Sequence, residues 1–131
     1  GADYVIDPNS QDLEKIIKKE TKIGADIVSD AVGFLLDQAI PLVKKGGDIV
    51  LFGINEAAKV QICQAPIVFN EIKIHGKFIT KGTFPAAIQI IENMLIPINK
   101  LVTHRLPLKD AAKGIDLMTK GEGIKVIIEI N

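Results

Sequence analysis

The sequence has few of the residues that build disulfides, metal centres and nucleic-acid interfaces. Its 131 residues include one cysteine, two histidines, one tyrosine and no tryptophan, and sixteen basic residues balance sixteen acidic ones. The single cysteine, Cys63, excludes an intramolecular disulfide and favours a reducing cytoplasm. Zero net charge argues against a nucleic-acid or anionic-membrane surface, and no uncharged apolar run reaches the roughly 18 residues that cross a bilayer. We therefore expect a cytoplasmic globular protein with no nucleic-acid and no membrane partner.

Motifs of self-contained catalysis and of phosphate binding are also missing. Cys63, His75 and His104 do not stand at ligand spacings such as C-x-x-C or H-x-x-x-H, so we expect no metal ligand in the chain. The sequence contains no G-x-S-x-G elbow, no G-x-G-x-x-G fingerprint and no P-loop. We therefore expect no catalytic residue in this chain by itself and no pyrophosphate cradle of the usual kind.

Isoleucine carries much of the apolar content. The chain has twenty-three isoleucines and nine valines, and such β-branched residues favour strands, in unbroken runs strands that are covered on both faces. The only methionines are Met94 and Met118. Because no methionine stands at the start, we expect that the chain does not begin where translation begins: either residues were removed or the chain is a piece of a longer protein.

Strand patterns alternate with helical patterns along the chain. We expect strands at residues 4–6, 25–32, 48–54, 60–62, 71–78, 102–106 and 124–130. We expect helices at residues 13–23, capped by Asn9 or Ser10, and at residues 34–45, 83–96 and 109–120. Strands joined by helices of this length require crossover connections, so the pattern predicts an α/β fold with a parallel sheet. Gly33 and Gly53 each end an apolar strand, where a glycine serves either a tight turn or the close approach of backbone to a ligand.

The chain resembles the C-terminal part of the medium-chain dehydrogenases, most closely the zinc-dependent alcohol, polyol and threonine dehydrogenases. The resemblance lies in an ordered series of segments: GADYVIDP, GADIVSDAVG, LVKKGGDIVLFGI, IKIHGKF, LVTHRLPL, DAAKGIDLM and GEGIKVIIEI. It implies a parallel, three-layer Rossmann-like sheet that is incomplete here, because the first two strands of the dinucleotide-binding domain would lie upstream. Residues 1–98 would form this partial cofactor domain, and residues 99–131 a strand-helix-strand return to the catalytic domain.

The missing strands have a geometric consequence. In the Rossmann strand order 3-2-1-4-5-6, residues 4–6 would be the third strand and the strand around Ile27 the fourth. The two strands between them are absent from the chain. We therefore expect residues 4–6 to pair beside residues 27–31, to pair with another chain, or to be disordered.

The resemblance also implies which residues border NAD or NADP. Val32 and Gly33 would lie by the adenine side of the cofactor, and Phe52, Gly53 and Ile54 by the nicotinamide ribose. Lys77, Phe78 and Ile79 would offer main-chain groups to the carboxamide. Lys125 would face the pyrophosphate, its alternative being a solvated lysine beside a strand.

By the same resemblance, the parent protein would be a zinc-dependent, NAD(P)-linked alcohol or polyol dehydrogenase whose zinc ligands lie outside this chain, which alone would be inactive. The alternatives are a zinc-independent quinone or enoyl reductase of the same superfamily and a non-catalytic dimerising fragment. The edge strand Ile72 to Phe78 would pair two subunits into a homodimer, unless Lys73 and Lys77 protect it as a solvent-facing edge.

Overall fold

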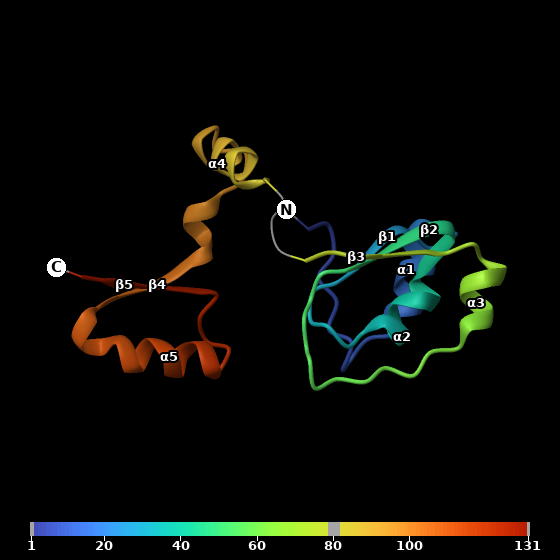
Figure 1. Ribbon diagram of the computed structural model, residues 1–131, viewed down its shortest axis with the longest axis horizontal. Coiled ribbons are helices and arrows are strands. Elements are labelled where there is room, and N and C mark those ends of the chain that lie inside the picture. Colours follow the sequence, from blue (N-terminus) through green and yellow to red (C-terminus); the bar gives the residue numbers. More distant parts are fainter. Residues whose placement is uncertain (1, 79–81, 131) are drawn as a thin grey trace. The chain divides into compact units, whose positions relative to one another are not determined.

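The computed structural model describes residues 2–78 and 82–130, and it divides the chain into two compact units, Gly1–Ile79 and Thr80–Asn131 (Figure 1). The first unit contains α1 (Leu13–Thr21), β1 (Ala25–Asp30), α2 (Leu36–Ala39), the 3₁₀ turn η1 (Ile40–Leu42), β2 (Val43–Leu51), α3 (Gln64–Phe69) and β3 (Lys73–Gly76). The second contains α4 (Phe84–Glu92), η2 (Ile98–Leu101), β4 (Val102–Pro107), η3 (Leu108–Asp110), α5 (Ala111–Thr119) and β5 (Lys125–Glu129). This alternation of helices and strands confirms the α/β class.

The strands of the first unit form one parallel sheet in the order β1-β2-β3. Val28 lies opposite Ile49, and Ile49 lies opposite Ile74, so an apolar row crosses all three strands. Parallel neighbours need a crossover between consecutive strands, and these two crossovers carry α2 and α3. The parallel sheet predicted from the sequence is therefore confirmed, with β2 at its centre and β1 and β3 at its edges.

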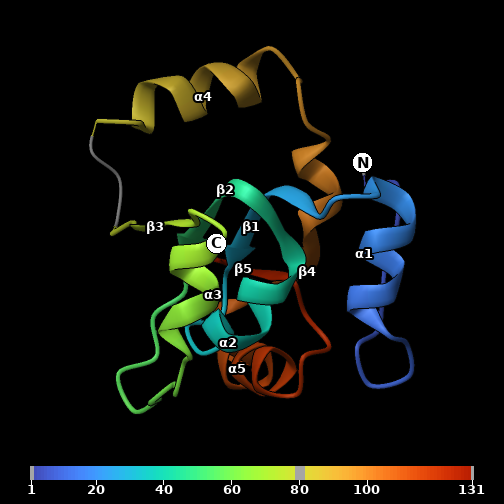
Figure 2. The ribbon, with the colours of Figure 1, turned by 90° about the vertical axis from the view of Figure 1, so that its right-hand side faces the viewer.

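The core of this unit lies where the helices cover the sheet. Ile49 in β2 is completely buried, and burial of a side chain of this size contributes about 1.5–3 kcal/mol. The buried apolar residues are Ala39, Ile40, Val43, Ile49 and Ile72, and Val28, Leu36, Leu51 and Ile67 pack against them. In the view of Figure 2, α2 lies between α1 and α3, both of which contact η1. The core thus fixes the central strand and the crossover helices to each other.

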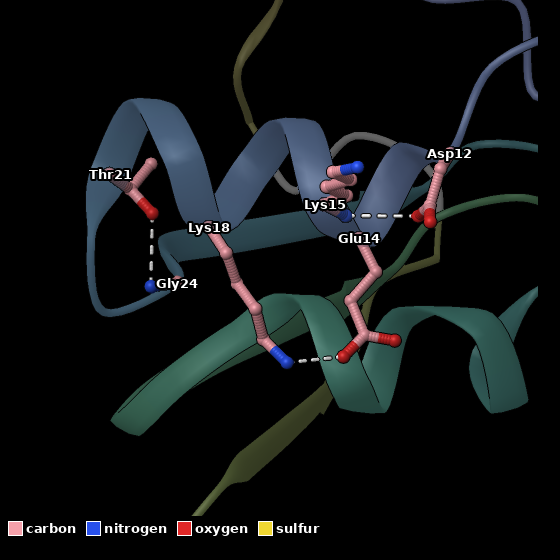
Figure 3. Close-up of polar contacts among 6 residues, drawn as sticks. All are labelled: Asp12, Glu14, Lys15, Lys18, Thr21 and Gly24. Carbon is pink, nitrogen blue, oxygen red and sulfur yellow. Dashed lines mark hydrogen bonds and ion pairs between the residues drawn. The ribbon is translucent and has the colours of Figure 1, made fainter.

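Helix α1 is capped by Asp12, so the predicted caps, Asn9 and Ser10, are wrong. The Asp12 carboxylate accepts a hydrogen bond from the N–H of Lys15 at 3.0 Å (Figure 3). The earlier carboxylate of Asp7 instead accepts hydrogen bonds from the Asn9 N–H and the Ser10 hydroxyl. These two residues therefore belong to a turn at Asp7 that precedes the helix.

Helix α1 is also tied to the start of β1. Lys18 and Glu14, one turn apart, form an exposed ion pair, and the Gly24 N–H donates to Thr21 Oγ1 at 2.9 Å (Figure 3). Gly24 has φ +104°, a left-handed conformation that glycine adopts without strain. The chain can therefore turn directly from α1 into the sheet.

Residues 4–6 do not form the strand that their sequence predicts. They pair with no strand in the described ranges, and the Tyr4 hydroxyl donates to Glu20 Oε2 at 2.7 Å instead. A strand needs a neighbour for its backbone hydrogen bonds, and no described strand offers one here. The expectation of pairing beside residues 27–31 is therefore wrong, while pairing with another chain stays a prediction.

The helix predicted at residues 34–45 is shorter than expected. It consists of α2 and η1 and ends at Leu42, next to Pro41, which lacks the N–H that a longer helix would need. Residues 44 and 45, predicted as the end of this helix, belong with residues 46 and 47 to an irregularity inside β2, where the register passes from Ala25 opposite Val43 to Ile27 opposite Asp48. The two glycines of this stretch therefore lie where the regular pairing of β2 with β1 is interrupted.

The short strand predicted at residues 60–62 is wrong: these residues form neither strand nor helix, and a helix that the sequence analysis did not predict, α3, follows at Gln64. Pro66 is the third residue of α3, and the N–H groups of a first helical turn have no partner within the helix. Proline is therefore tolerated at this position of the helix.

The second unit is built on β4 and β5, which pair in parallel and are joined by α5 (Figure 1). Gly114 of α5 is buried, and a Cβ atom there would lie 3.1 Å from Val126 and 3.4 Å from Leu106. The glycine thus allows the helix to approach both strands. The strands and the helix predicted after residue 100 are confirmed. No helix in the described ranges is long and apolar enough to cross a membrane.

Candidate functional site

The carboxyl ends of β1, β2 and β3 meet at one edge of the parallel sheet, which is where open α/β sheets bind their ligands. Three turns leave the sheet there: residues 31–35 after β1, residues 52–55 after β2, and Lys77 and Phe78 after β3. The Lys77 N–H donates to the Leu51 carbonyl at 2.9 Å, which holds the end of β3 beside the end of β2. Seven of the nine residues predicted to border a cofactor lie in these three turns.

Gly33 and Gly53 hold the first two turns in direct backbone contact. A Cβ atom on Gly53 would lie 2.3 Å from the Val32 nitrogen, and one on Gly33 would lie 2.7 Å from the Asn55 nitrogen and 2.9 Å from the Gly53 carbonyl carbon. Gly33 also has φ +96°, which side chains rarely allow. Both glycines are therefore needed for the turns to touch. The space beside each glycine is filled by the backbone of the other turn, which supports the tight-turn interpretation over the close approach of a ligand.

The side chains around this contact form an open apolar surface. Val32, Phe52, Ile54 and Phe78 are between 49% and 68% exposed in the chain. These side chains follow strands whose carboxyl ends meet at one edge of the sheet, so they leave apolar area there that another group can cover.

Asp30 is the residue of this site that sequence reasoning missed. It ends β1 and is 4% exposed. Its Oδ1 accepts hydrogen bonds from the N–H groups of Val32 and Gly33 at 2.8 and 2.7 Å, and its Oδ2 accepts one from Leu35 at 2.9 Å. The signal was present in the sequence, because an aspartate two or three residues before a glycine at the end of a strand is typical of a turn closed by its own side chain.

The environment of Asp30 favours its charged form. Burial by itself raises the pKa of the carboxyl group, but the hydrogen bonds from the backbone N–H groups of the turn outweigh that effect and hold the pKa below its ordinary value. The Asp30 carbonyl in addition accepts hydrogen bonds from the Phe52 and Gly53 N–H groups at 2.9 and 2.8 Å. One residue therefore joins the turn after β1 to the turn after β2.

The two other predicted site residues lie elsewhere. Ile79 is outside the described residues. Lys125 is the first residue of β5 in the second unit, and its side chain is exposed. The structure therefore brings Val32, Gly33, Phe52, Gly53 and Ile54 together, adds Lys77 and Phe78 at the neighbouring strand, and leaves the roles of all of them as predictions.

The described residues offer little other chemistry. Within residues 2–78 and 82–130, no three histidine, cysteine, aspartate or glutamate side chains lie together as a metal site would require. His75 Nε2 and Asp48 Oδ1 are 2.6 Å apart on neighbouring strands, and both side chains are partly exposed. This pair ties β3 to β2 and offers two ligands at most.

Comparison with known proteins finds similarity to dehydrogenases. Residues 1–93 match the family model described as zinc-binding dehydrogenase. The chain is 33% identical to an erythritol/L-threitol dehydrogenase of Mycolicibacterium smegmatis, over 96% of this chain and 36% of that protein, and 30% identical to a sorbitol dehydrogenase of Gallus gallus, over 98% and 38%. It superposes on the crystal structure of 2R,3R-butanediol dehydrogenase from Bacillus subtilis with a TM-score of 0.87 and 26% identity, over 96% of this chain and 38% of the other.

The chain thus spans less than two-fifths of the length of the relatives it matches, and it matches them over nearly all of its own length. The family model covers well over half of the chain, including all three strands whose carboxyl ends form the candidate site. The chain is a member of the zinc-binding dehydrogenase family.

Proposed function

We propose that this chain is the C-terminal portion of the cofactor-binding part of an NAD(P)-dependent alcohol or polyol dehydrogenase. The observation that carries the proposal is the joined pair of turns after β1 and β2, with exposed apolar side chains at the edge of a parallel sheet where such folds bind nucleotides. Solved relatives of similar fold contain such cofactors: one from Escherichia coli is complexed with NADH, at 26% identity and a TM-score of 0.84.

In this proposal each turn contributes a different kind of contact. Val32, Phe52 and Ile54 cover apolar parts of the cofactor, since they are exposed in the chain. The Lys77 N–H already donates to Leu51, so Lys77 offers its carbonyl oxygen, and not its N–H, to the carboxamide. Lys125 supplies a positive charge for the pyrophosphate.

The nicotinamide ring of the bound cofactor would accept a hydride from the carbinol carbon, so that the alcohol becomes a carbonyl compound and a proton is released. The described residues hold no set of zinc ligands. We therefore assign no step of the reaction to zinc in this chain, and any zinc ligands belong to other parts of the protein. Relatives named for erythritol and L-threitol, for sorbitol and for D-arabitol phosphate support a polyol as substrate.

The intact gene product provides the test of this function. We expect it to reduce NAD⁺ or NADP⁺ in the presence of a polyol such as sorbitol or erythritol, and to lose this activity with a chelator. Activity that reduces a quinone and resists the chelator would instead indicate the zinc-independent branch. Absence of any nucleotide-dependent oxidation or reduction would refute the proposal.

Titration of the 131-residue chain with NADH, together with metal analysis, tests whether this chain by itself binds the cofactor and zinc. We expect weak or undetectable binding of the cofactor and no stoichiometric zinc, because the chain offers only part of the cofactor surface. Tight binding of either would contradict the idea that the chain is only half of a site.

The cytoplasm is the location we propose, which the single, exposed Cys63 supports.

We further propose that the protein is a homodimer that pairs through the open edge of β3. This strand is at the edge of the sheet, and an open edge offers unpaired backbone groups to a second copy. Along a strand, the N–H groups of consecutive residues point to opposite sides. Because the Lys77 N–H points to β2, the Gly76 N–H points to the open edge.

Gly76 therefore allows a matched test of the dimer. A Cβ atom on Gly76 would meet nothing within 4 Å, so Gly76→Ala keeps the N–H without crowding the strand, whereas Gly76→Pro removes the N–H. We expect sedimentation to show a dimer for the original chain and for the alanine variant, and a shift toward monomer for the proline variant. A monomeric original chain, or equal dimerisation of both variants, would rule out this edge as the interface.

A further inference from the structure

Asp30 is a buried carboxylate whose partners are N–H groups and not a cation. It is 4% exposed, and it forms no ion pair with the described lysine, arginine and histidine side chains. A buried carboxylate is costly unless its oxygens are satisfied by hydrogen bonds. Here three backbone N–H groups supply them, all from the turn of residues 32–35.

The same residue also acts on the second turn. The Asp30 carbonyl accepts hydrogen bonds from both Phe52 and Gly53, while Gly53 leaves no space between itself and Val32. The two turns are therefore joined by the Asp30 carbonyl and by the close backbone contacts of Gly33 and Gly53. A change in its side chain should alter the first turn without removing any side chain that faces outward.

An asparagine cannot make the same set of contacts. The carboxylate presents two acceptor oxygens to three donors, whereas an amide has one oxygen and an NH₂ group that would face a further N–H. Either Leu35 or the pair Val32 and Gly33 would then lose its acceptor. Hydrogen bonds to a charged group contribute more than neutral ones. The turn would therefore have fewer hydrogen bonds, and the remaining ones would be weaker.

We propose that Asp30 is a positioning residue for the nucleotide cofactor, holding the turns after β1 and β2 at the spacing that the cofactor contacts. The inference rests on the function proposed above. Because Asp30 is 4% exposed, its side chain offers almost no surface to a cofactor, and it acts through Val32, Gly33 and the residues of the second turn. The alternative is a role confined to the stability of the fold.

The decisive experiment measures steady-state kinetics of the intact dehydrogenase with the Asp30→Asn variant. We expect the KM for the nucleotide to rise about tenfold, while the KM for the alcohol stays within about twofold, because a displaced turn weakens one substrate only. Asp26→Asn is the matched control: Asp26 is on the same strand, and its carboxylate is exposed and paired with Lys44. This control should keep the KM for the nucleotide within about twofold of the original value.

The Asp30→Glu variant guards against a failure of Asp30→Asn to fold. It keeps both oxygens and the charge, and its extra methylene shifts them, so we expect a smaller rise in the KM for the nucleotide, about threefold. A KM for the nucleotide that is unchanged in the folded variants, or a parallel rise in both KM values, would overturn the proposal.

Amide hydrogen exchange on the 131-residue chain separates this proposal from the proposed function. In the Asp30→Asn variant the N–H groups of residues 32, 33 and 35, which donate to the carboxylate, should exchange faster than in the original chain, while those of Ile49 and its neighbours in β2 should not. If the intact protein has no nucleotide-dependent activity but the exchange changes as expected, the function is wrong and the positioning of the turns stands. Unchanged exchange at these three amides would refute the positioning role whatever the activity.

Discussion

Replacing Gly53 by alanine should separate the two turns of the candidate site. The new Cβ atom would lie 2.3 Å from the Val32 nitrogen and 2.4 Å from the Gly33 nitrogen, whereas ordinary contacts begin at 3.4 Å. Neither neighbouring atom is the end of a flexible side chain, so the backbone of one turn must move by about 1 Å. Gly53 is not in the left-handed conformation, and the expected effect is therefore crowding alone.

The magnitude follows from what that movement breaks. The Phe52 and Gly53 N–H groups are 2.9 and 2.8 Å from the Asp30 carbonyl, so a displacement of this size takes both beyond hydrogen-bond distance. Two hydrogen bonds contribute about 0.5–1.5 kcal/mol each, and crowding of a packed region costs about 1–3 kcal/mol where it is not relieved. We expect Gly53→Ala to lower the free energy of unfolding by about 2–6 kcal/mol, the sum of these two contributions.

Urea unfolding of the 131-residue chain, followed by far-ultraviolet circular dichroism, measures this effect. Gly76→Ala is the control, because a Cβ atom at Gly76 meets nothing within 4 Å and its free energy of unfolding should change by less than about 1 kcal/mol. A Gly53→Ala variant as stable as Gly76→Ala would show that the turns are not in contact and would refute the reasoning about the site.

Three further outcomes test the core, the cap and the buried carboxylate. Ile49→Ala should lower the free energy of unfolding by about 2–5 kcal/mol because Ile49 is fully buried, whereas Ile27→Ala in the neighbouring strand should cost less than about 1 kcal/mol because Ile27 is 64% exposed; urea unfolding compares them. Asp12→Ala should cost about 1 kcal/mol through loss of the α1 cap, and equal stability of the two chains would contradict the assigned cap. The pKa of Asp30 is lowered in the fold, so the carboxylate contributes stability above its unfolded pKa of about 3.9, and this contribution is lost as the pH falls through the folded pKa. Unfolding measured between about pH 7 and pH 3 should show a smaller loss of stability on acidification for Asp30→Asn than for the original chain.

Local sequence patterns predicted a helix or strand correctly where its formation depends mainly on its own residues. The unbroken apolar run at residues 48–54 predicted the central strand, and Ile49 of that run is the fully buried residue of the core. The helical spacing after Thr83 predicted α4. The patterns missed α3 and placed residues 44 and 45 in a helix. Pro66 stands in the first turn of α3, where proline is tolerated, and residues 44–47 form a strand irregularity that depends on the pairing of β2 with β1.

The strand at residues 4–6 failed for a different reason. Its sequence suits a strand, but a strand exists only where another strand accepts its backbone hydrogen bonds, and none of the described strands does so. A sequence pattern can therefore predict a strand for which the structure provides no neighbouring strand.

The order of residues along the chain was enough to determine the parallel α/β succession, the buried central strand and the glycines at the strand ends. It was also enough to carry the resemblance to the dehydrogenase family that the comparisons confirm. Only the tertiary structure decided that Gly33 and Gly53 touch and that Asp30 joins their turns. These contacts link residues about twenty positions apart, and they arise because a parallel sheet brings the carboxyl ends of its strands to one edge.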